Sequence, residues 1–169
     1  EKFLQIADLD LITKTSIVNK SIECVVSNDE VRLSCFDHLH IKERLHDIEL
    51  NLEPAFLKFH NRFLHLVLRE VLENAVKFSH NGTHIFVKGE KKDSVYLLTI
   101  TDFGIGMHQN EIDNIETFNQ FDRDFHQLDG NGLGLAFVKK AMNYFDGGLV
   151  IESQKNKFTR TILTFLSAD

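Results

Sequence analysis

The sequence feature that most constrains the fold is the periodic spacing of apolar residues between His60 and Phe78. The apolar residues that share one side of a helix there are Leu64, Leu68, Val71, Leu72 and Ala75. Spacings of three and four residues predict a long helix over residues 60–78 with one side against a core. Because Gly82 supplies a residue that readily adopts a left-handed conformation, we expect the helix to stop within residues 79–82.

A second stripe on the same helix is polar and consists of Glu70, Asn74 and Lys77. A carboxylate, a carboxamide and an ammonium group stacked along about two turns can hold a metal ion through oxygen and a phosphate through charge. The same three residues also fit a solvated helix face, which is the commoner arrangement. The motifs further along the chain decide between these two interpretations.

Strands are predicted in neighbouring pairs, with helices between the pairs. The predicted strands cover residues 22–26, 31–33, 48–52, 56–59, 83–89, 95–101, 149–153 and 158–166. Helices are expected over 36–47, 60–78 and from the glycines at 130–134 to about Phe145, whereas 27–30 fits a turn or a helix start and 90–94 a hairpin loop. This order predicts an α+β two-layer sandwich and argues against a Rossmann domain.

Residues 1–20 show no clean period, so we expect a tail or linker before a single domain at 21–169. With 19 Lys and Arg against 25 Asp and Glu, the net charge of −6 favours neither a nucleic-acid nor an anionic-membrane partner. The apolar runs are shorter than the roughly 18 residues that span a bilayer, and we expect a cytoplasmic location. Cys24 and Cys35 lack metal-ligand spacing and are expected to be buried, reduced thiols.

Two glycine motifs lie in the second half of the chain. Asp102 follows a predicted strand and precedes Gly104 and Gly106. Its carboxyl could accept a hydrogen bond from an exocyclic amine, while the glycines let a flat ring approach the backbone. Alternatively, the carboxyl could cap its own loop. The sequence Gly130-x-Gly132-x-Gly134 opens a helix, where free amides favour a phosphate, although glycines there also serve tight packing.

About two dozen residues lie between these motifs, from His108 to Asp129. They show no good periodicity, and a stretch of that length is too long for an idle connection. We therefore expect a lid there, and we expect it to be the most mobile part of the protein without a ligand.

Together and in this order, the motifs resemble the ATP-binding catalytic domain of two-component sensor histidine kinases. The wider superfamily includes gyrase, the mismatch-repair ATPases and the ninety-kilodalton heat-shock chaperone. The resemblance covers about residues 36–169 and rests on four segments: E-V-L-E-N-A-V-K-F-S as the N-box, D-F-G-I-G-M as the first glycine box, F-N-Q-F-D-R as the lid, and G-N-G-L-G-L-A-F-V-K-K as the second glycine box. It implies a Bergerat-type fold, with a mixed, mostly antiparallel sheet and about three helices on one face.

The resemblance also implies roles for individual residues. Asn74 would coordinate a Mg²⁺ ion that bridges the ATP phosphates, Lys77 would contact a phosphate, and Asp102 would bind the adenine amine. Glu70 would polarise the attacking group or hold a metal-bound water, and Arg123 would reach the γ-phosphate from the lid. The residues implied to shape the adenine pocket or cradle the phosphates are Gly104, Gly106, Gly130, Gly132, Leu133, Gly134 and Leu135. Phe78 stands where the family often has Tyr, so a hydroxyl contact is lost.

The resemblance implies an enzyme that transfers the γ-phosphate to a histidine on a separate dimerisation domain, for later passage to a response regulator. None of the nine histidines has the family's phosphoacceptor setting, since Pro54 is the only proline and does not follow a suitable histidine. The acceptor is therefore expected upstream, in a dimer mate or in another protein. Two alternatives stay open: a regulatory nucleotide-binding module that docks a partner, and an anti-sigma-type serine kinase.

Overall fold

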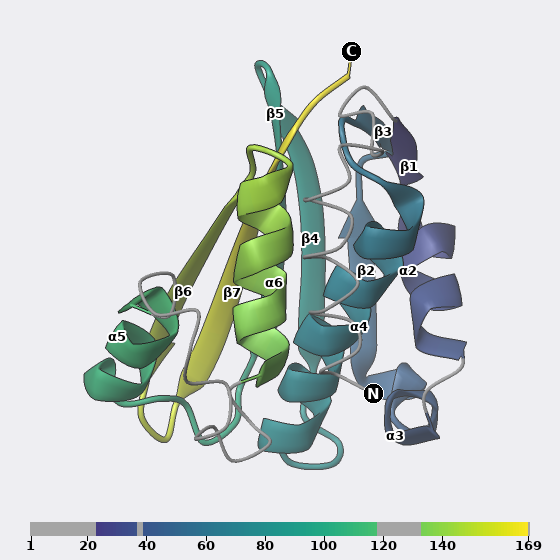
Figure 1. Cartoon of the computed structure of the whole chain (residues 1–169). Helices are drawn as coiled ribbons and strands as arrows, with labels where there is room; N and C mark the ends of the chain where they lie inside the picture. Colours follow the sequence, from purple (N-terminus) through teal and green to yellow (C-terminus); the bar gives the residue numbers. More distant parts are fainter. Residues whose placement is uncertain (1–22, 37–38, 118–132, 169) are drawn as a thin grey trace.

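The structure is a computed structural model, and it describes residues 23–36, 39–117 and 133–168. Its larger sheet has five strands in the order β2-β4-β5-β7-β6, and among these pairs only β2 and β4 run parallel (Figure 1). The strands are β2 (Ile48–Leu52), β4 (Ile85–Lys92), β5 (Val95–Asp102), β6 (Gly148–Gln154) and β7 (Phe158–Leu166). The predicted α+β class with a mixed, mostly antiparallel sheet is confirmed.

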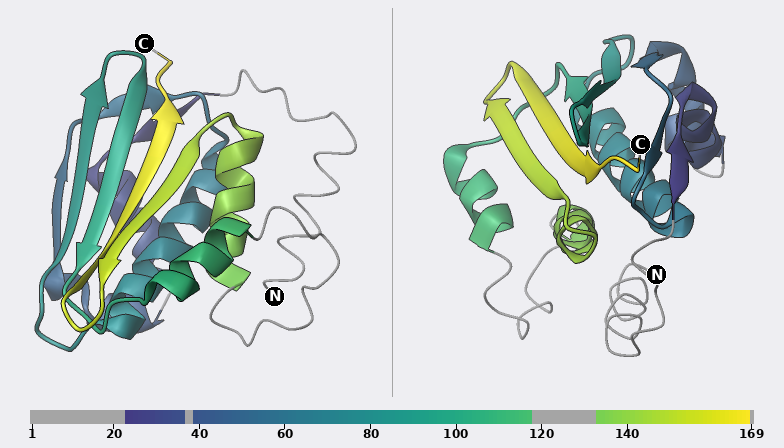
Figure 2. Two further views of the ribbon diagram at one scale, coloured as in Figure 1. Left: turned by 90° about the vertical axis from the view of Figure 1, so that its left-hand side faces the viewer. Right: turned by 90° about the horizontal axis from the view of Figure 1, so that it is seen from above.

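Helices cover one face of this sheet. The helical segments are α2 (Asn28–Phe36), α3 (Leu39–Glu43), the 3-10 turn η1 (Leu45–Asp47), α4 (Asn61–Phe78), α5 (Gln109–Thr117) and α6 (Leu133–Tyr144). Helices α4 and α6 lie side by side against the sheet, and α2 packs on the side of α4 away from α6 (Figures 1 and 2). The arrangement agrees with the expectation of about three helices on one face.

Helix α4 forms the centre of the core. The residues of its buried side are Phe63, Leu64, Val67, Leu68, Val71, Leu72, Ala75 and Val76. They include every member of the predicted apolar stripe, so the helix and its inward face are confirmed. His60 caps the helix, because its Nδ1 accepts the backbone N–H of Arg62 at 3.2 Å.

A second, two-stranded sheet joins β1 (Cys24–Val26) to β3 (Ala55–Leu57). The strand predicted at 31–33 is wrong, because these residues lie inside α2. Ser27 Oγ accepts the N–H of Glu30 at 3.3 Å, and Asp29 and Glu30 place negative charge in the first helical turn. The cap and the helix dipole outweigh the β-preference of Val31, which confirms the helix-start alternative for residues 27–30.

The helix predicted over 36–47 is interrupted. Arg44 has φ −114° and ψ 17°, which lies outside the helical range, and it separates α3 from η1. The Arg44 side chain points into the protein, where it is 5% exposed. An arginine amid charged and histidine neighbours gave no hint of that burial.

The segment 108–129 is not irregular throughout. Residues 109–117 form α5, and Glu111 Oε2 accepts the N–H of His108 at 2.7 Å at its start. Ile112 of α5 packs with Leu135 and Ile151 in a small apolar cluster beside the main core. The expectation of an irregular stretch is therefore wrong for α5, and the remainder of the predicted lid, 118–129, lies outside the described residues.

Two smaller expectations also have outcomes. The hairpin loop between β4 and β5 is shorter than predicted, because Lys92 already pairs with Val95 and Asp93 takes a positive φ of 53° in the turn. Cys24 is a buried free thiol whose pKa rises to about 12, first because of burial and then because of the Glu30 charge. The side chain of Cys35 and the predicted tail at 1–20 lie outside the described residues.

Candidate functional site

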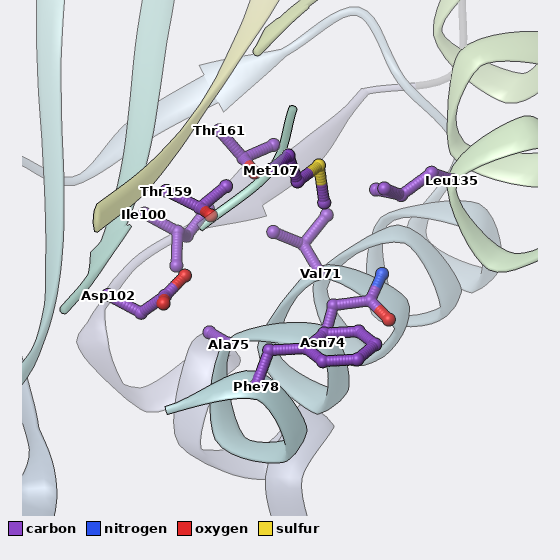
Figure 3. Close-up of a pocket in the computed structure, with 10 residues that line it drawn as sticks. All are labelled: Val71, Asn74, Ala75, Phe78, Ile100, Asp102, Met107, Leu135, Thr159 and Thr161. Carbon is purple, nitrogen blue, oxygen red and sulfur yellow. The ribbon is translucent and has the colours of Figure 1, made fainter. Parts of the chain in front are cut away.

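A pocket opens between the C-terminal half of α4 and the facing ends of β5 and β7 (Figure 3). Ten side chains line it, from α4, β5, the loop before α5, α6 and β7: Val71, Asn74, Ala75, Phe78, Ile100, Asp102, Met107, Leu135, Thr159 and Thr161. Most of them are apolar. The polar groups are few and come from different elements, which is the usual composition of a small-molecule site.

Asp102 is the last residue of β5 and is only 5% exposed. Its Oδ1 accepts the N–H of Gly104 at 3.0 Å, so the expected capping of its own loop is present. Burial raises the pKa of the carboxyl to about 6, while the Gly104 hydrogen bond and the Arg44 charge act in the opposite direction. Figure 3 shows the carboxyl among the pocket residues, so the same aspartate can also accept a hydrogen bond from a ligand.

Asn74 faces this pocket from α4 (Figure 3). Its Nδ2 atom is buried and has no hydrogen-bond partner among the described residues. A buried polar atom in that state costs about 1–3 kcal/mol, and such atoms are rare in folded proteins. This NH2 group would be completed by an acceptor atom, such as an oxygen of a bound molecule or a water.

Glu70 and Lys77 flank Asn74 along α4, but neither lines the pocket. Glu70 is 1% exposed, and its Oε1 lies 3.4 Å from Nη2 of Arg69. Lys77 is exposed, with its ammonium nitrogen 5.2 Å from the centre of the Phe78 ring at the pocket wall. The polar stripe thus runs from the core to the surface, and a solvated helix face is the wrong description of its buried end.

The first glycine motif packs between the end of α4 and the end of β6. A Cβ on Gly104 would clash with the backbone carbonyl of Phe78, and the neighbouring Ile105 N–H donates to that same carbonyl at 3.0 Å. Gly106 has φ +58°, and a Cβ there would clash with the carbonyl of Gln154. Both glycines are therefore required by packing, and their expected role in admitting a flat ring stays a prediction.

The second glycine motif is only partly described. Gly134 is buried in the first turn of α6, and Leu135 is 3% exposed and lines the pocket. Leu133 begins the helix. Gly130, Gly132 and the lid arginine, Arg123, lie outside the described residues.

Sequence reasoning missed Met107 and the two threonines of the pocket. Thr159 pairs in register with Asp102, and Thr161 pairs with Ile100; both threonines are buried. The sequence predicted the strand at 158–166 but not which of its residues point inward. It could not show that β7 pairs with β5, because β6 intervenes in the sequence.

Metal ligation at this site would need oxygens from a ligand. No three His, Cys, Asp or Glu side chains come together as a metal site within the part of the chain that the structure describes. An amide oxygen of Asn74 together with phosphate oxygens and water fits Mg²⁺, which prefers oxygen ligands and retains several waters. None of the helices in the described ranges combines the length and apolar character needed to cross a membrane.

Comparison with known proteins places these residues in a family context. The model of the "Histidine kinase-, DNA gyrase B-, and HSP90-like ATPase" family matches residues 60–169. The signal transduction histidine-protein kinase ArlS of Staphylococcus epidermidis is 28% identical over 95% of this chain. The heme sensor protein HssS of Staphylococcus saprophyticus is 30% identical over 68% of it. The chain spans 36% of ArlS and 25% of HssS, about a third of these relatives or less.

Two solved structures share the fold. The mycobacterial sensor histidine kinase MprB has a TM-score of 0.69 and 24% identity, over 86% of this chain and 98% of that one. The Acinetobacter baumannii histidine kinase AdeS has a TM-score of 0.69 and 18% identity, over 99% of this chain and 77% of that one. At these identities the likeness concerns the fold alone.

Proposed function

The chain belongs to the histidine kinase-, DNA gyrase B- and HSP90-like ATPase family, and from that premise we propose that its pocket binds Mg-ATP. We propose further that this domain donates the γ-phosphate to a histidine on a separate phosphoacceptor domain, as the catalytic part of a sensor histidine kinase. A response regulator would receive the phosphoryl group next. The curated relatives named as histidine kinases support this proposal.

One observation carries the proposal of a nucleotide site. The buried carboxyl of Asp102 faces one pocket with the amide of Asn74, whose nitrogen has no partner among the described residues, and the two come from different elements. Asp102 would accept the adenine amine at the sheet side, and Asn74 would ligate Mg²⁺ through its amide oxygen at the helix side. Bound Mg²⁺ would neutralise phosphate charge, which is most of what phosphoryl transfer asks of a site besides positioning.

The remaining proposed roles follow from position along the chain. Lys77 lies at the rim and would contact a phosphate, while Glu70, one helical turn before Asn74, would orient the attacking group. Gly134 and Leu135 lie in the first turn of α6 beside the pocket, so backbone amides there would cradle phosphates with those of Gly130, Gly132 and Leu133. Arg123 keeps its proposed γ-phosphate contact, and the cytoplasmic location likewise stays a prediction.

Titration calorimetry with Mg-ATP tests the nucleotide site. We expect the wild type to bind and Asn74→Asp to lose at least about a hundredfold in affinity, because a carboxylate adds repulsion against phosphate. Asn143→Asp is the matched control: it makes the same charge change at an exposed position of α6 and should bind like the wild type. Equal affinities for Asn74→Asp and the control would remove Asn74 from the site.

A phosphotransfer assay tests the reaction. The domain is mixed with a candidate histidine-bearing acceptor domain and with ATP labelled at the γ-phosphate. We expect acid-labile, base-stable label on the acceptor, as phosphohistidine gives, and none with Asn74→Asp. ATP binding without any transfer would favour the regulatory docking module, and acid-stable label on a serine would favour the serine-kinase alternative.

A further inference from the structure

A buried arginine outside the pocket holds the end of α4. Arg44 lies between α3 and η1 and is 5% exposed. Its guanidinium and Nε donate to Asp47 Oδ2 at 2.7 Å, Val76 O at 3.0 Å, Ser79 O at 3.1 Å, Ser79 Oγ at 2.8 Å, His80 O at 2.8 Å and Thr83 O at 3.1 Å. All acceptors except Asp47 belong to the last turn of α4 or to the loop that follows it.

These contacts complete the hydrogen bonds of a helix terminus. The last four carbonyls of an α-helix have no partner within the helix. In α4, Arg44 takes the carbonyl of Val76, and the Ile105 N–H of the first glycine loop takes that of Phe78. The terminus is therefore held from two sides, and the positive charge of Arg44 also suits the negative end of the helix dipole.

Asp47 holds the Arg44 side chain in place. Its Oδ2 accepts both Nε of Arg44 and the N–H of Gly82 at 3.1 Å, so one oxygen ties the arginine to the loop after α4. The Arg44 hydrogen bond is the main cause that holds the pKa of the Asp47 carboxyl below its usual range. We call the pair Arg44 and Asp47 the helix-end clamp.

We propose that Arg44 is a positioning residue of the nucleotide site, which sets the last turns of α4 against Asp102. The inference rests on the proposed function. Asn74, Ala75 and Phe78 line the pocket from the part of α4 that the clamp holds, and Asp102 lines it from β5. A displacement of about 1 Å between such groups can cost about a hundredfold in activity.

Arg44 also acts on Asp102 through its charge. Burial raises the pKa of that carboxyl, and the Arg44 charge opposes the rise. The polar side chains that α4 and β7 contribute to the same pocket are Asn74, Thr159 and Thr161, none of which titrates. The positive charge of Arg44 therefore favours the carboxylate form of Asp102, which accepts a hydrogen bond from an amine.

The test measures the dissociation constant of Mg-ATP between pH 5 and 8 for the wild type, Arg44→Met and Arg44→Lys. We expect Arg44→Met to bind about tenfold more weakly at pH 7.5, with the loss of binding at low pH moved upward by about half a pH unit. Arg44→Lys keeps the charge and loses the fork of donors, so its pH midpoint should return toward wild type while part of the affinity loss persists.

Val26→Ala is the control for stability alone. Val26 is fully buried in the small β1–β3 sheet, away from the pocket, and its truncation should lower the melting temperature without changing the pH midpoint. All variants are compared at a temperature at which each is folded. An Arg44→Met protein with the affinity and midpoint of Val26→Ala would overturn the positioning role.

If Arg44→Met does not fold, Asp47→Asn replaces it. The amide keeps the shape and one acceptor oxygen but removes the charge that holds Arg44, so we expect a twofold to fivefold loss of Mg-ATP affinity. Unchanged affinity in a destabilised Asp47→Asn protein would count against the clamp. A wild type that binds no Mg-ATP would overturn the proposed function itself, whereas normal wild-type binding with insensitive clamp variants would overturn only this inference.

Discussion

Two aspartates, one on each side of the end of α4, show how differently a protein can use buried carboxyls. Asp47 and Asp102 are each 5% exposed. The pKa of Asp47 lies below its usual range because Arg44 donates to it, whereas burial raises that of Asp102 to about 6. Asp47 sits in the helix-end clamp, and Asp102 lines the pocket.

The contrast teaches that the partners of a buried carboxyl, and not its burial, decide what it does. Asp47 has an arginine and a backbone amide, so it stabilises the folded domain and offers little to a ligand. Asp102 has the Gly104 amide and lies in a pocket with the Asn74 amide nitrogen, which lacks a partner within the described ranges. A carboxyl with a perturbed pKa in a pocket is a reasonable candidate for function.

The largest effect is expected at Gly104, which lies between the end of α4 and the pocket residue Asp102. Its N–H donates to Asp102, and its Cα packs on the carbonyl of Phe78 at the end of α4. Gly104→Ala should lower the free energy of unfolding by about 3 kcal/mol, because the backbone of the loop and that of the helix must separate. Chemical denaturation measures the loss.

Gly148→Ala is the control for the glycine prediction. The nearest heavy atom to a Cβ at Gly148 would be Thr164 Cβ at 3.7 Å, an ordinary contact. The unfolding free energy of that variant should stay within about 1 kcal/mol of the wild type. Equal losses for the two variants would show that the junction between α4 and the glycine loop is not tightly packed.

Exchanging each aspartate for its amide should separate the two regions. We expect Asp102→Asn to bind Mg-ATP about a hundredfold more weakly, a change of about 2.7 kcal/mol, while the domain stays folded. Asp47→Asn should mainly lower the melting temperature, with only a twofold to fivefold loss of Mg-ATP affinity. If both variants lost Mg-ATP affinity and melting temperature to the same extent, the two carboxyls would share one structural role.

A smaller effect is expected in the pH dependence of stability. The folded pKa of Asp102 is raised from 3.8 to about 6, so the folded state binds its proton more tightly than the unfolded state does. Stability from this group is therefore complete below about pH 4 and is lost as pH rises through 6, and the part lost between pH 5 and 8 is about 1–2 kcal/mol. Asp47, with its lowered pKa, acts in the opposite sense in acid.

Denaturation of the wild type and Asp102→Asn between pH 5 and 8 isolates the Asp102 contribution. The wild type should lose stability relative to the variant as pH rises, because the amide that replaces the carboxyl in the variant cannot titrate. A constant difference between the two proteins would contradict the raised pKa.

Much of the fold could be predicted because its signals are local. The apolar period of residues 60–78 and the predicted strand at 48–52 each correspond to an element of the structure, and Gly82 lies just after the end of α4 as expected. Val31 misled because a helix cap upstream outweighed its β-preference, and α5 was missed because its short apolar side is only Ile112 and Ile115. Such errors come from competition between weak local preferences.

Only the site residues that belong to sequence motifs could be predicted. Asn74 and Asp102 were identified and meet in one pocket, although their neighbours Thr159 and Thr161 depend on a strand pairing that skips β6. Arg44 gave no sign, because an arginine among charged residues usually faces solvent. Its burial follows from carbonyls at the end of α4, about 35 residues away in sequence, that need donors.

The most direct test asks whether Asn74 and Asp102 hold opposite ends of one nucleotide. Protein-observed NMR titrations would compare the affinities of Mg-ATP and of adenosine for the wild type, Asn74→Asp and Asp102→Asn. We predict that Asn74→Asp weakens Mg-ATP and leaves adenosine unchanged, whereas Asp102→Asn weakens both ligands. Adenosine binding that survives Asp102→Asn, or that fails in Asn74→Asp, would contradict the account.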